Sequence, residues 1–409
     1  MESIARLMAE LPKEYEKDCF EQGAITRRRG VANSTDLMML SMFHLQNGCT
    51  LLEISEVARI TKLGEMSDVA FMKRFEKCGN WFRAINKKIA AKELINYQKP
   101  NWMEEKTVVA VDASDVTEKG RSGRTYRLHY ALDIFTMGSV DYMITDAKVG
   151  ESLVNFKIKS GYLVIGDRAY STISGIEHCE KNGAEFILRM RKNSFTVRNE
   201  MGEPVDFLGT IKNTGSKEYA DIRAFATNLD GKKVPIRICA KKKDPEAIIQ
   251  TQKKLKRKES KKQFIISDEA KVFNEYIVVV TNLNDDIPAE EILETYRLRW
   301  QVEIYFKRLK SILDFGELPK RRPDSVIAWL NGKLMIALLI EILLSKTAFS
   351  LKRLPDRSIW REIKFLNLWL VTGFCGDDVL FSELGNTLIN LKVEKRKRGN
   401  RLQLSNPLS

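Results

Sequence analysis

Hydrophobic residues three and four positions apart run through the first hundred residues of the chain, and this spacing predicts helices. It is clearest in the segments DLMMLSMFHLQ, LLEISEVARI and SDVAFMKRFEKCGNWFRAI. Ser34 or Thr35 can cap the first of these helices through its side-chain hydroxyl. The last two flank the sequence KLGEM, an arrangement typical of a helix-turn-helix but also common in ordinary helical bundles. We therefore expect a helical region over residues 1–100.

From residue 107 the pattern changes to β-branched runs of strand length. The runs TVVAVDAS, YRLHYALDIF, VDYMITDAKV, YLVIGDRAYS and AEFILRM each predict a strand, and STISGIEHCEKNG predicts a helix between the last two. Strands mixed with a helix in this order indicate an α/β domain with a mixed sheet. We expect residues 101–194 to form its first part and the more helical residues 286–345 to form its second part.

Between these two parts, residues 195–285 are predicted to form a β-rich insertion. Its strand-like pieces are FTVRN, EYADIRAFATN, KVPIRICAK and FNEYIVVVTNL, separated by polar turns. Residues 241–262 carry ten lysines and arginines against three acids. Such a segment is either a solvated helix or loop that keeps the protein soluble, or a surface that contacts phosphates.

The last part of the chain, residues 346–409, is predicted to be a helical region with a basic tail, KVEKRKRGNR. The most apolar run, at 326–344, is interrupted by Asn331, Lys333 and Glu341. A membrane span needs about 20 nearly uncharged residues, so this run is expected to be a buried helix. The N-terminus lacks the uncharged apolar core of a signal peptide. We therefore expect a cytoplasmic protein that does not bind membranes.

Composition narrows the chemistry further. The chain has 68 lysines and arginines against 54 acids, a formal net charge of +14, which favours a polyanionic partner such as nucleic acid. The six cysteines show no CxxC spacing, which argues against a zinc site and a disulfide framework. Three isolated histidines exclude a histidine-based metal site. Any metal would have carboxylate ligands, and this favours Mg²⁺ or Mn²⁺.

The stretch YRLRWQVEIYFKRLK, residues 296–310, combines the apolar spacing of a helix with many charges. At about 100° per residue, its polar side chains Tyr296, Arg299, Glu303 and Lys310 fall within a sector of roughly 60°. Trp300, Ile304 and Leu309 lie on other faces and are expected to pack the helix against the protein. An i,i+4 ion pair between Arg299 and Glu303 would explain only two of the four polar residues.

Two aspartates follow apolar strand runs, Asp112 after TVVAV and Asp167 after LVIG. Each alone could cap a turn. Together with Glu303, however, they form a set of oxygen ligands suited to a pair of hard divalent cations, which activate water and stabilise a leaving oxygen at phosphorus. Two further acids are candidates of lower rank. We expect Asp115 to cap the turn after the strand and Asp146 to be structural.

These residues carry a resemblance to a known family. Asp112, Asp167 and Glu303 resemble the DDE triad of RNase H-like transposases. Tyr296-x2-Arg299-x3-Glu303-x6-Lys310 is similar to the Y-R-E-K signature of the IS-four family of bacterial insertion-sequence transposases. GDRAYS resembles the family's second-aspartate motif DRGY, with Ala169 where glycine is common. The resemblance covers residues 107–320 well and the helical ends only loosely.

The resemblance implies an RNase H-like catalytic domain, interrupted by the β-rich insertion, that performs cut-and-paste transposition with Mg²⁺, or Mn²⁺ in its place. Such an enzyme binds double-stranded terminal inverted repeats, cleaves DNA, in some members through a hairpin, and joins the 3′ ends to target DNA as a homodimer. It works in the bacterial cytoplasm at the nucleoid. Asp112, Asp167 and Glu303 would bind the metal, and Tyr296, Arg299 and Lys310 would contact DNA.

Three further expectations concern DNA contacts. Residues 1–100 are expected to bind DNA, as is Arg168, for which a salt bridge within the domain is the alternative. Some relatives stack a flipped base on a tryptophan of the last insertion strand, but no tryptophan lies between 103 and 299. Tyr276 could stack instead or could be a core tyrosine. Two other functions remain open, namely a nuclease without strand transfer and an inactive, transposase-derived DNA-binding protein.

Overall fold

The protein is described from a computed structural model that covers residues 2–46, 49–90, 97–118, 125–214, 218–312, 315–319 and 322–350. The α-helices are α1 Glu2–Ala9, α2 Tyr15–Glu21, α3 Ser34–Gln46, α4 Leu51–Ile60, α5 Asp68–Ala90, α6 Ile173–Lys181, α7 Phe207–Asn213, α8 Pro245–Lys262, α9 Asp268–Phe273, α10 Ala289–Arg297, α11 Trp300–Ile312 and α12 Pro323–Ser350. The strands are β1 Thr107–Glu118, β2 Tyr126–Asp133, β3 Ser139–Asp146, β4 Tyr162–Gly166, β5 Glu185–Arg189, β6 Val197–Arg198, β7 Ala220–Thr227, β8 Lys233–Lys242, β9 Tyr276–Thr281 and β10 Glu317–Leu318. The predicted mixed α/β architecture is confirmed for this part of the chain.

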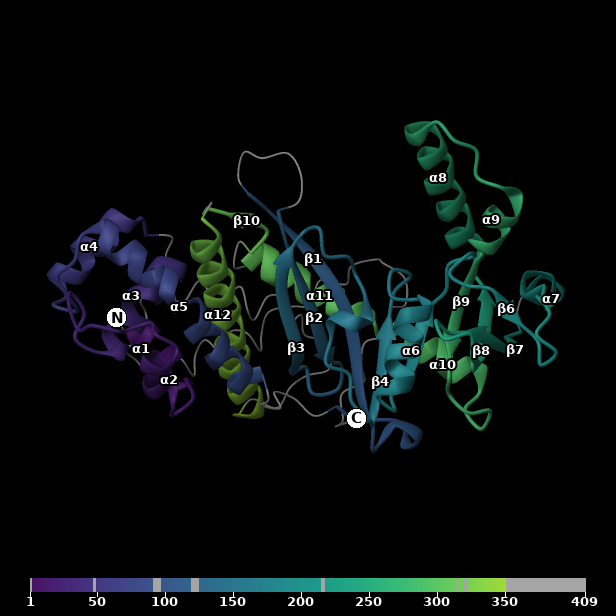
Figure 1. Ribbon diagram of the computed structural model, residues 1–409, viewed down its shortest axis with the longest axis horizontal. Helices are drawn as coiled ribbons and strands as arrows, with labels where there is room; N and C mark the ends of the chain where they lie inside the picture. The colour runs from purple at the N-terminus through teal and green to yellow at the C-terminus, as the bar shows by residue number, and fades with distance from the viewer. Residues whose placement is uncertain are drawn as a thin grey trace.

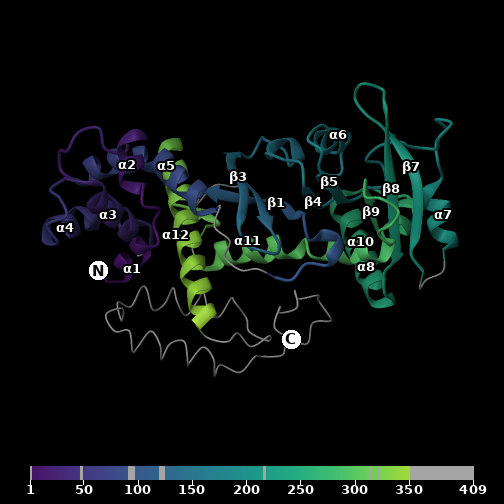
Figure 2. The same ribbon diagram turned by 90° about the horizontal axis from the view of Figure 1, so that it is seen from below.

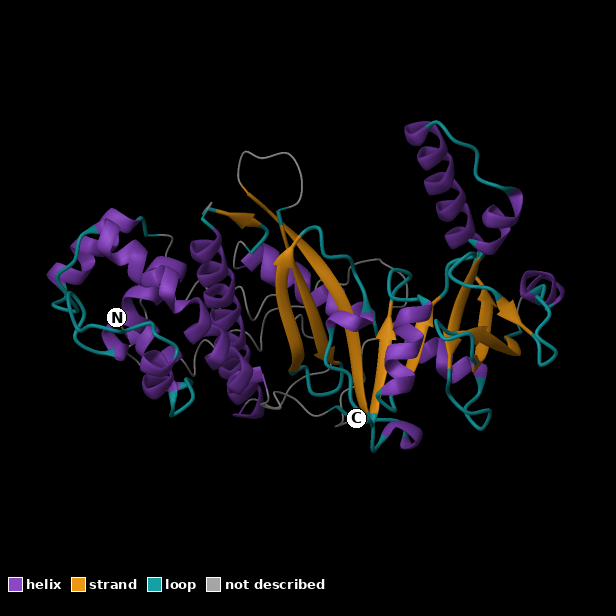
Figure 3. Cartoon of the chain, viewed as in Figure 1, coloured by secondary structure: helices purple, strands orange, loops and turns teal. Residues whose placement is uncertain are grey.

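One twisted sheet runs through the centre of the molecule (Figures 1 and 3). Its strand order is β3-β2-β1-β4-β5-β9-β8-β7-β6, and β10 pairs with β1 outside this path. Strands β1 to β3 form an antiparallel meander, and β4 and β5 lie parallel to β1 and to each other. Strands β6 to β9 are antiparallel to one another.

The insertion is continuous with the central sheet. Its last strand, β9, pairs with β5, and β8 and β7 follow outward. The basic segment expected within it is helix α8, which projects from the sheet and has no buried residue (Figure 1). The insertion therefore extends the sheet of the α/β domain instead of forming a separate β unit.

Helices α1 to α5 form a group at one end of the sheet, and α12 packs along α5 within this group (Figure 1). A capping box begins α4, because Thr50 and Glu53 each accept a hydrogen bond from the other residue's backbone N–H. Among the described residues, Pro323–Leu343 of α12 is the one segment long and apolar enough to cross a membrane, and 89% of its most apolar window is buried within the protein. It is a core helix, as its interrupted apolar run predicted. The expected tail, 392–401, lies outside the described residues.

The sheet has a hydrophobic core on each face. On one face, α11 contributes Val302, Tyr305 and Leu309 to a core shared with the helical group. On the other face, α6 contributes Ile176 and Cys179 to a second core. Figure 2 shows α10 and α11 along one side of the sheet and α6 on the opposite side. A side chain of a central strand therefore points either toward α11 or toward α6.

The single helix predicted over residues 296–310 is wrong. Helix α10 ends at Arg297 and α11 begins at Trp300. In the turn between them, the N–H of Arg299 donates to the carbonyl of Tyr296 at 3.2 Å, and the N–H of Val302 donates to the carbonyl of Arg299 at 3.2 Å. These i to i+3 bonds tighten the backbone and interrupt the helix. Helical spacing continues across the turn in the sequence, and therefore it did not reveal the break.

Candidate active site

The pairing of β1 with β4 brings Asp112 beside Asp167. The register places Val109 next to Val164 and Ala110 next to Ile165. Continued by two residues, the same register places Asp112 at the level of Asp167, and neighbouring strands lie about 4.8 Å apart. Asp167 directly follows the end of β4, as predicted. Asp112 lies in the middle of the twelve-residue β1 and not at its end, so that part of the prediction is wrong.

Both aspartates lie on the face of the sheet that α11 covers. Ala110 in β1 and Ile165 in β4 belong to the core beneath α11, and side chains two residues apart share a face. Asp112 and Asp167 therefore have the same orientation as these two residues. Glu303 lies in the first turn of α11, and its side chain is 27% exposed. Two strands and one helix thus supply the three acids.

The carboxylate of Asp112 has the most perturbed environment of the three. One of its oxygens accepts a hydrogen bond from the N–H of Ala113 at 2.8 Å. Burial raises the pKa of Asp112 to about 7, while the Ala113 N–H and the Arg299 guanidinium act to lower it. The negative charges of Asp167 and Glu303 raise the pKa further. All three acids are therefore within electrostatic reach of one another.

Arg299 bridges two of these acids. Its guanidinium lies 3.7 Å from a carboxylate oxygen of Asp112 and forms a hydrogen-bonded ion pair with Glu303. The side chain of Arg299 is only 13% exposed. Within the described residues, no three histidine, cysteine or acidic side chains are grouped closely enough to bind one metal ion. The carboxylate oxygens suit a divalent cation, but in this structure the guanidinium of Arg299 lies between Asp112 and Glu303.

The backbone after β4 fixes the position of Asp167. Its carboxylate accepts a hydrogen bond from the N–H of Ala169 at 2.7 Å, and its carbonyl accepts one from Tyr170 at 3.2 Å. A Cβ on Gly166 would lie 2.9 Å from atoms of both Tyr170 and Leu188, so a larger residue does not fit there. Ala169 is not among the residues with positive φ, which explains why alanine can stand where the family commonly has glycine.

The four residues of the predicted polar helix face are not equivalent. Tyr296 is 6% exposed, its ring lies 6.0 Å from the guanidinium carbon of Arg299, and its hydroxyl has no hydrogen-bond partner in the described structure. Lys310 is exposed, with its aliphatic chain over Gly316. The structure thus groups Tyr296, Arg299 and Glu303. It gives Lys310 no ion pair within the described residues.

The remaining candidates lie in several different environments. Tyr276 is 6% exposed and belongs to the core on the α6 face, which favours the core interpretation over base stacking. Asp115 lies within β1 and forms an ion pair with Arg127 at 2.9 Å, so the turn-cap prediction is wrong. Asp146 ends β3 and accepts a hydrogen bond from the N–H of Lys148 at 2.7 Å, a structural role.

Arg168 has a hydrogen bond and no ion pair in the described structure. Its guanidinium donates to the side-chain oxygen of Asn274 at 2.9 Å. Burial, reinforced by Arg189 and Arg191, lowers the pKa of Arg168 to about 10. Sequence reasoning did not single out Arg189, although a charged residue at the end of the apolar run AEFIL was an available signal.

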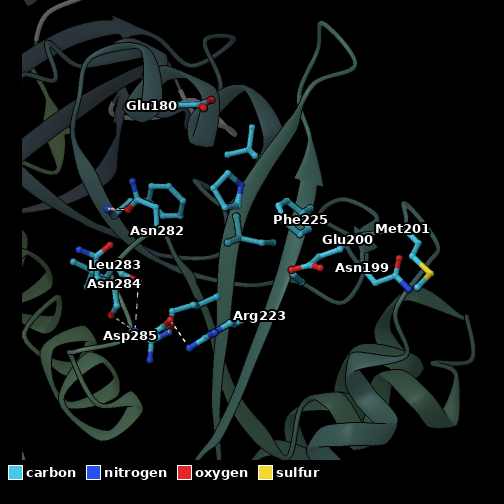
Figure 4. A pocket seen from close by; sticks show the side chains of 16 residues that line it. Glu180, Asn199, Glu200, Met201, Arg223, Phe225, Asn282, Leu283, Asn284 and Asp285 are labelled. Carbon is cyan, nitrogen blue, oxygen red and sulfur yellow. Dashed lines mark hydrogen bonds and ion pairs between the residues drawn. The ribbon is translucent and has the colours of Figure 1, made fainter.

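The structure also contains a cavity far from these acids (Figure 4). It has a volume of about 860 Å³ and is lined by residues that include Phe186, Phe225 and Asn282. The beginning of β5 and the end of β9 contribute to it, whereas Asp167 follows the opposite end of the neighbouring strand β4. Arg223 and Asp285 form an ion pair at its rim (Figure 4). The cavity therefore takes no part in the acid cluster.

Comparison with known proteins identifies the family. The model of a family described as the transposase DDE domain matches residues 103–339, more than half of the chain. The putative transposase InsL of insertion sequence element IS186A from Escherichia coli (strain K12) is 26% identical over 359 residues, 86% of this chain and 95% of the relative.

The transposase of IS421 from Escherichia coli is also 26% identical, over 360 residues that cover the same shares of the two chains. The transposase of IS231C from Bacillus thuringiensis subsp. berliner is 27% identical over 222 residues, 50% of this chain and 45% of the relative. The resemblance to the IS-four type of transposase is confirmed. The chain belongs to the transposase DDE domain family, and it is an enzyme of insertion-sequence transposition.

Proposed function

We propose that Asp112, Asp167 and Glu303 are the catalytic triad of this transposase. The observation that carries the proposal is the position of Asp112, whose carboxylate is within electrostatic reach of both Asp167 and Glu303 and shares the Arg299 guanidinium with Glu303. The order β3-β2-β1-β4-β5, with β4 and β5 parallel to β1, supports the RNase H-like domain expected from the resemblance. We assign residues 101–194 and 286–345 to that domain and residues 195–285 to its insertion.

The donor set fits a hard divalent cation. Burial raises the pKa of Asp112 and repulsion from Asp167 and Glu303 raises it further, and a bound cation would relieve this repulsion. Transposases with this domain depend on divalent metals, and we propose Mg²⁺, with Mn²⁺ as a substitute. Bound at this site, the metal supplies an activated water and charge stabilisation at phosphorus. The three carboxylates would hold it.

The other residues orient the DNA. Arg299 must exchange its carboxylate partners for a phosphate oxygen when metal binds, and its fixed fork geometry suits that contact. Tyr296 can donate its unpartnered hydroxyl to the same strand. Lys310 is exposed and can reach a phosphate further along. The scissile phosphodiester would then undergo in-line attack, first by water and later by the freed 3′-hydroxyl.

The partners follow from the same function. We propose that the enzyme binds the double-stranded inverted repeats of its element and target DNA, with the helical region 1–100 contributing to binding. Two copies would pair the two element ends as a homodimer, and the soluble, cytoplasmic protein would work at the nucleoid. The first rival is a nuclease of the same fold, which would cleave without joining 3′ ends. The second is an inactive DNA-binding protein, which the placement of Asp167 and Glu303 within electrostatic reach of Asp112 disfavours.

The test is cleavage of a labelled duplex that ends in the element's inverted repeat, with Mg²⁺, with Mn²⁺ and without metal. Wild type is compared with Asp112→Asn, Asp167→Asn and Glu303→Gln, and DNA affinity is measured in parallel. We expect metal-dependent nicking at the repeat boundary and a loss of at least about 10³-fold in each variant, with affinity retained.

The matched control is Asp115→Asn, since Asp115 lies in the same strand but faces Arg127. Cleavage that survives any one triad variant would remove that residue from the triad. Binding without cleavage under either metal would favour the inactive protein. Nicking with no joined product would favour the nuclease.

A further inference from the structure

We propose that Arg168, Arg189 and Lys243 form a second phosphate-binding site, for a backbone phosphate of the DNA strand that lies across the base of α8. The inference rests on the proposed function, because it takes DNA as the ligand. It adds a phosphate contact from the insertion, at Lys243 after β8, to the DNA contacts proposed for Tyr296, Arg299 and Lys310.

Strand topology brings these residues to one edge of the sheet. Arg189 ends β5 and Arg168 follows β4, which is parallel to β5. Strand β8 is antiparallel to β9, which is antiparallel to β5, so β8 ends at this same edge. Lys243 is the next residue. The register extends from Gly166 opposite Leu188 to Asp167 beside Arg189, so the proposed site adjoins the triad.

The three cations have only neutral hydrogen-bond acceptors in the described structure. Arg168 donates to the side-chain oxygen of Asn274 at 2.9 Å. Lys243 donates to the carbonyl of Asn274 and to the hydroxyl of Thr251, the latter at 3.2 Å. The Nε atoms of Arg168 and Arg189 are both buried and have no partner. Buried donors without acceptors are costly, so an anion that accepts from them would be strongly favoured.

Lys243 is repelled by several neighbouring positive charges. Burial lowers the pKa of Lys243 to about 8, and the positive charges of Arg189, Arg168 and Lys254 lower it further. Glu275, directly before β9, acts in the opposite direction, but it already accepts a hydrogen bond from Gln252. A phosphodiester placed among the three cations would relieve the repulsion and restore the proton on Lys243.

The position of the site indicates which phosphate it binds. Helix α8 begins at Pro245, two residues after Lys243, and its lysines continue outward on a helix with no buried residue. The triad lies on the other side of Arg189. A DNA backbone running from the triad toward α8 therefore passes over Arg168, Arg189 and Lys243, whereas a small free anion would have no use for the exposed helix beyond.

The experiment measures the affinity of the full chain for a labelled duplex of arbitrary sequence without divalent metal, across a series of salt concentrations. Phosphate contacts do not depend on sequence, so the element's ends are not required. Lys243→Gln should reduce the slope of log affinity against log salt by about 0.9, one phosphate contact. Lys243→Arg should keep the slope. The control is Lys181→Gln, because Lys181 lies on the α6 face in an ion pair with Glu177.

A pH series separates this role from a structural one. Wild-type affinity should fall between about pH 7 and 9 as Lys243 loses its proton, and Lys243→Arg should remove that component because arginine stays charged. An unchanged salt slope in Lys243→Gln, or weaker binding with the wild-type slope, would overturn the proposal. Competition by inorganic phosphate as strong as that by duplex, at equal ionic strength, would also overturn it. None of these results depends on cleavage, so a failure of the triad assignment remains distinguishable.

Discussion

Buried or half-buried arginines lie beside the cavity and beside the triad, toward opposite ends of the central strands. The arginines at these two places differ in how well their hydrogen bonds are satisfied. At the cavity edge, Arg237 is 5% exposed and forms an ion pair with Asp221. It also donates to the carbonyls of Asn284 and Ile287. At the triad edge, Arg168 and Arg189 each have a buried Nε without a partner.

Burial and positive charge alone therefore do not identify a DNA-binding residue. Arg237 is buried and positively charged, yet acceptors within the protein, Asp221 and the carbonyl of Ile287 among them, take its hydrogen bonds. Such an arginine holds the loop after β9 in place. Arg168 and Arg189 each bury an Nε donor that has no hydrogen-bond acceptor in the described structure, and this burial costs stability. The unsatisfied donors, and not the positive charge, indicate a missing ligand.

The largest expected effect is on the satisfied arginine. Arg237→Met should lower the free energy of unfolding by roughly 3 kcal/mol, because Asp221 and the carbonyls that Arg237 binds lose their buried donor. Denaturant titration measures this. The control, Arg223→Gln, removes an arginine whose side chain is 77% exposed and should change stability by less than about 0.5 kcal/mol. Equal effects of the two substitutions would contradict the comparison.

The next effect concerns the acid cluster at the triad edge. The pKa of Asp112 is raised to about 7 in the folded protein, so in metal-free protein its ionisation costs stability as pH rises from about 4 to 7. Asp112→Asn should therefore be more stable than wild type at pH 8, by up to a few kcal/mol at about 1.4 kcal/mol per pKa unit.

This advantage should disappear toward about pH 3, below the ordinary pKa of aspartate, where Asp112 is protonated in both the folded and the unfolded protein. Thermal unfolding in the presence of a chelator, measured across this pH range, checks the prediction. Added Mg²⁺ should stabilise wild type and not Asp112→Asn. A constant difference at all pH values would mean that Asp112 keeps an ordinary pKa.

A smaller effect is expected for the unsatisfied arginine. Arg168→Gln removes a buried cation whose Nε has no acceptor, so unfolding free energy should change by less than about 1 kcal/mol. DNA affinity, measured by fluorescence anisotropy, should fall by roughly tenfold because one charge-assisted phosphate contact is lost. A stability loss as large as that of Arg237→Met would make Arg168 a structural residue as well.

The smallest expected effect is at Lys310, which is exposed and has no ion pair within the described residues. Lys310→Ala should lower the salt slope of DNA binding by at most about 0.9, with no change in the unfolding midpoint. Lys307→Ala is a useful comparison, since Lys307 is an exposed lysine of the same helix whose ammonium lies over the ring of Trp300 at 4.4 Å. An unchanged slope in Lys310→Ala would show that Lys310 faces solvent in the complex.

Much of the fold was predictable because its elements have strong local patterns. The β-branched runs TVVAV and LVIG correspond to parts of β1 and β4, and Asp167 directly follows the end of β4, as expected. The grouping of Asp112 with Asp167 was predicted from their chemistry and from the family resemblance, because the strand patterns alone do not give the pairing register on which it depends. Register is a tertiary property, and neither strand specifies it alone.

The failures have similar causes. The turn at Leu298–Arg299 interrupts a helix without proline or glycine, so no local signal marks it. Asp115 looked like a turn cap because its partner Arg127 comes from the neighbouring strand β2. Tyr276 begins β9 and Arg189 ends β5. At such positions, the face of the sheet to which the side chain points determines whether it packs in the core or can contact DNA. That face is set by neighbours that are distant in sequence.

The pairing of β9 with β5 also has a consequence for synthesis on the ribosome. Thr281 of β9 bonds to the carbonyl of Phe186, a residue 95 positions earlier in the chain. Until β9 emerges, β5 is an unprotected edge strand with the apolar core residues Phe186, Ile187 and Leu188. At about 5–20 residues per second, this edge stays open for roughly 5–20 s. The nascent protein is therefore exposed to aggregation at this edge while its own insertion is being made.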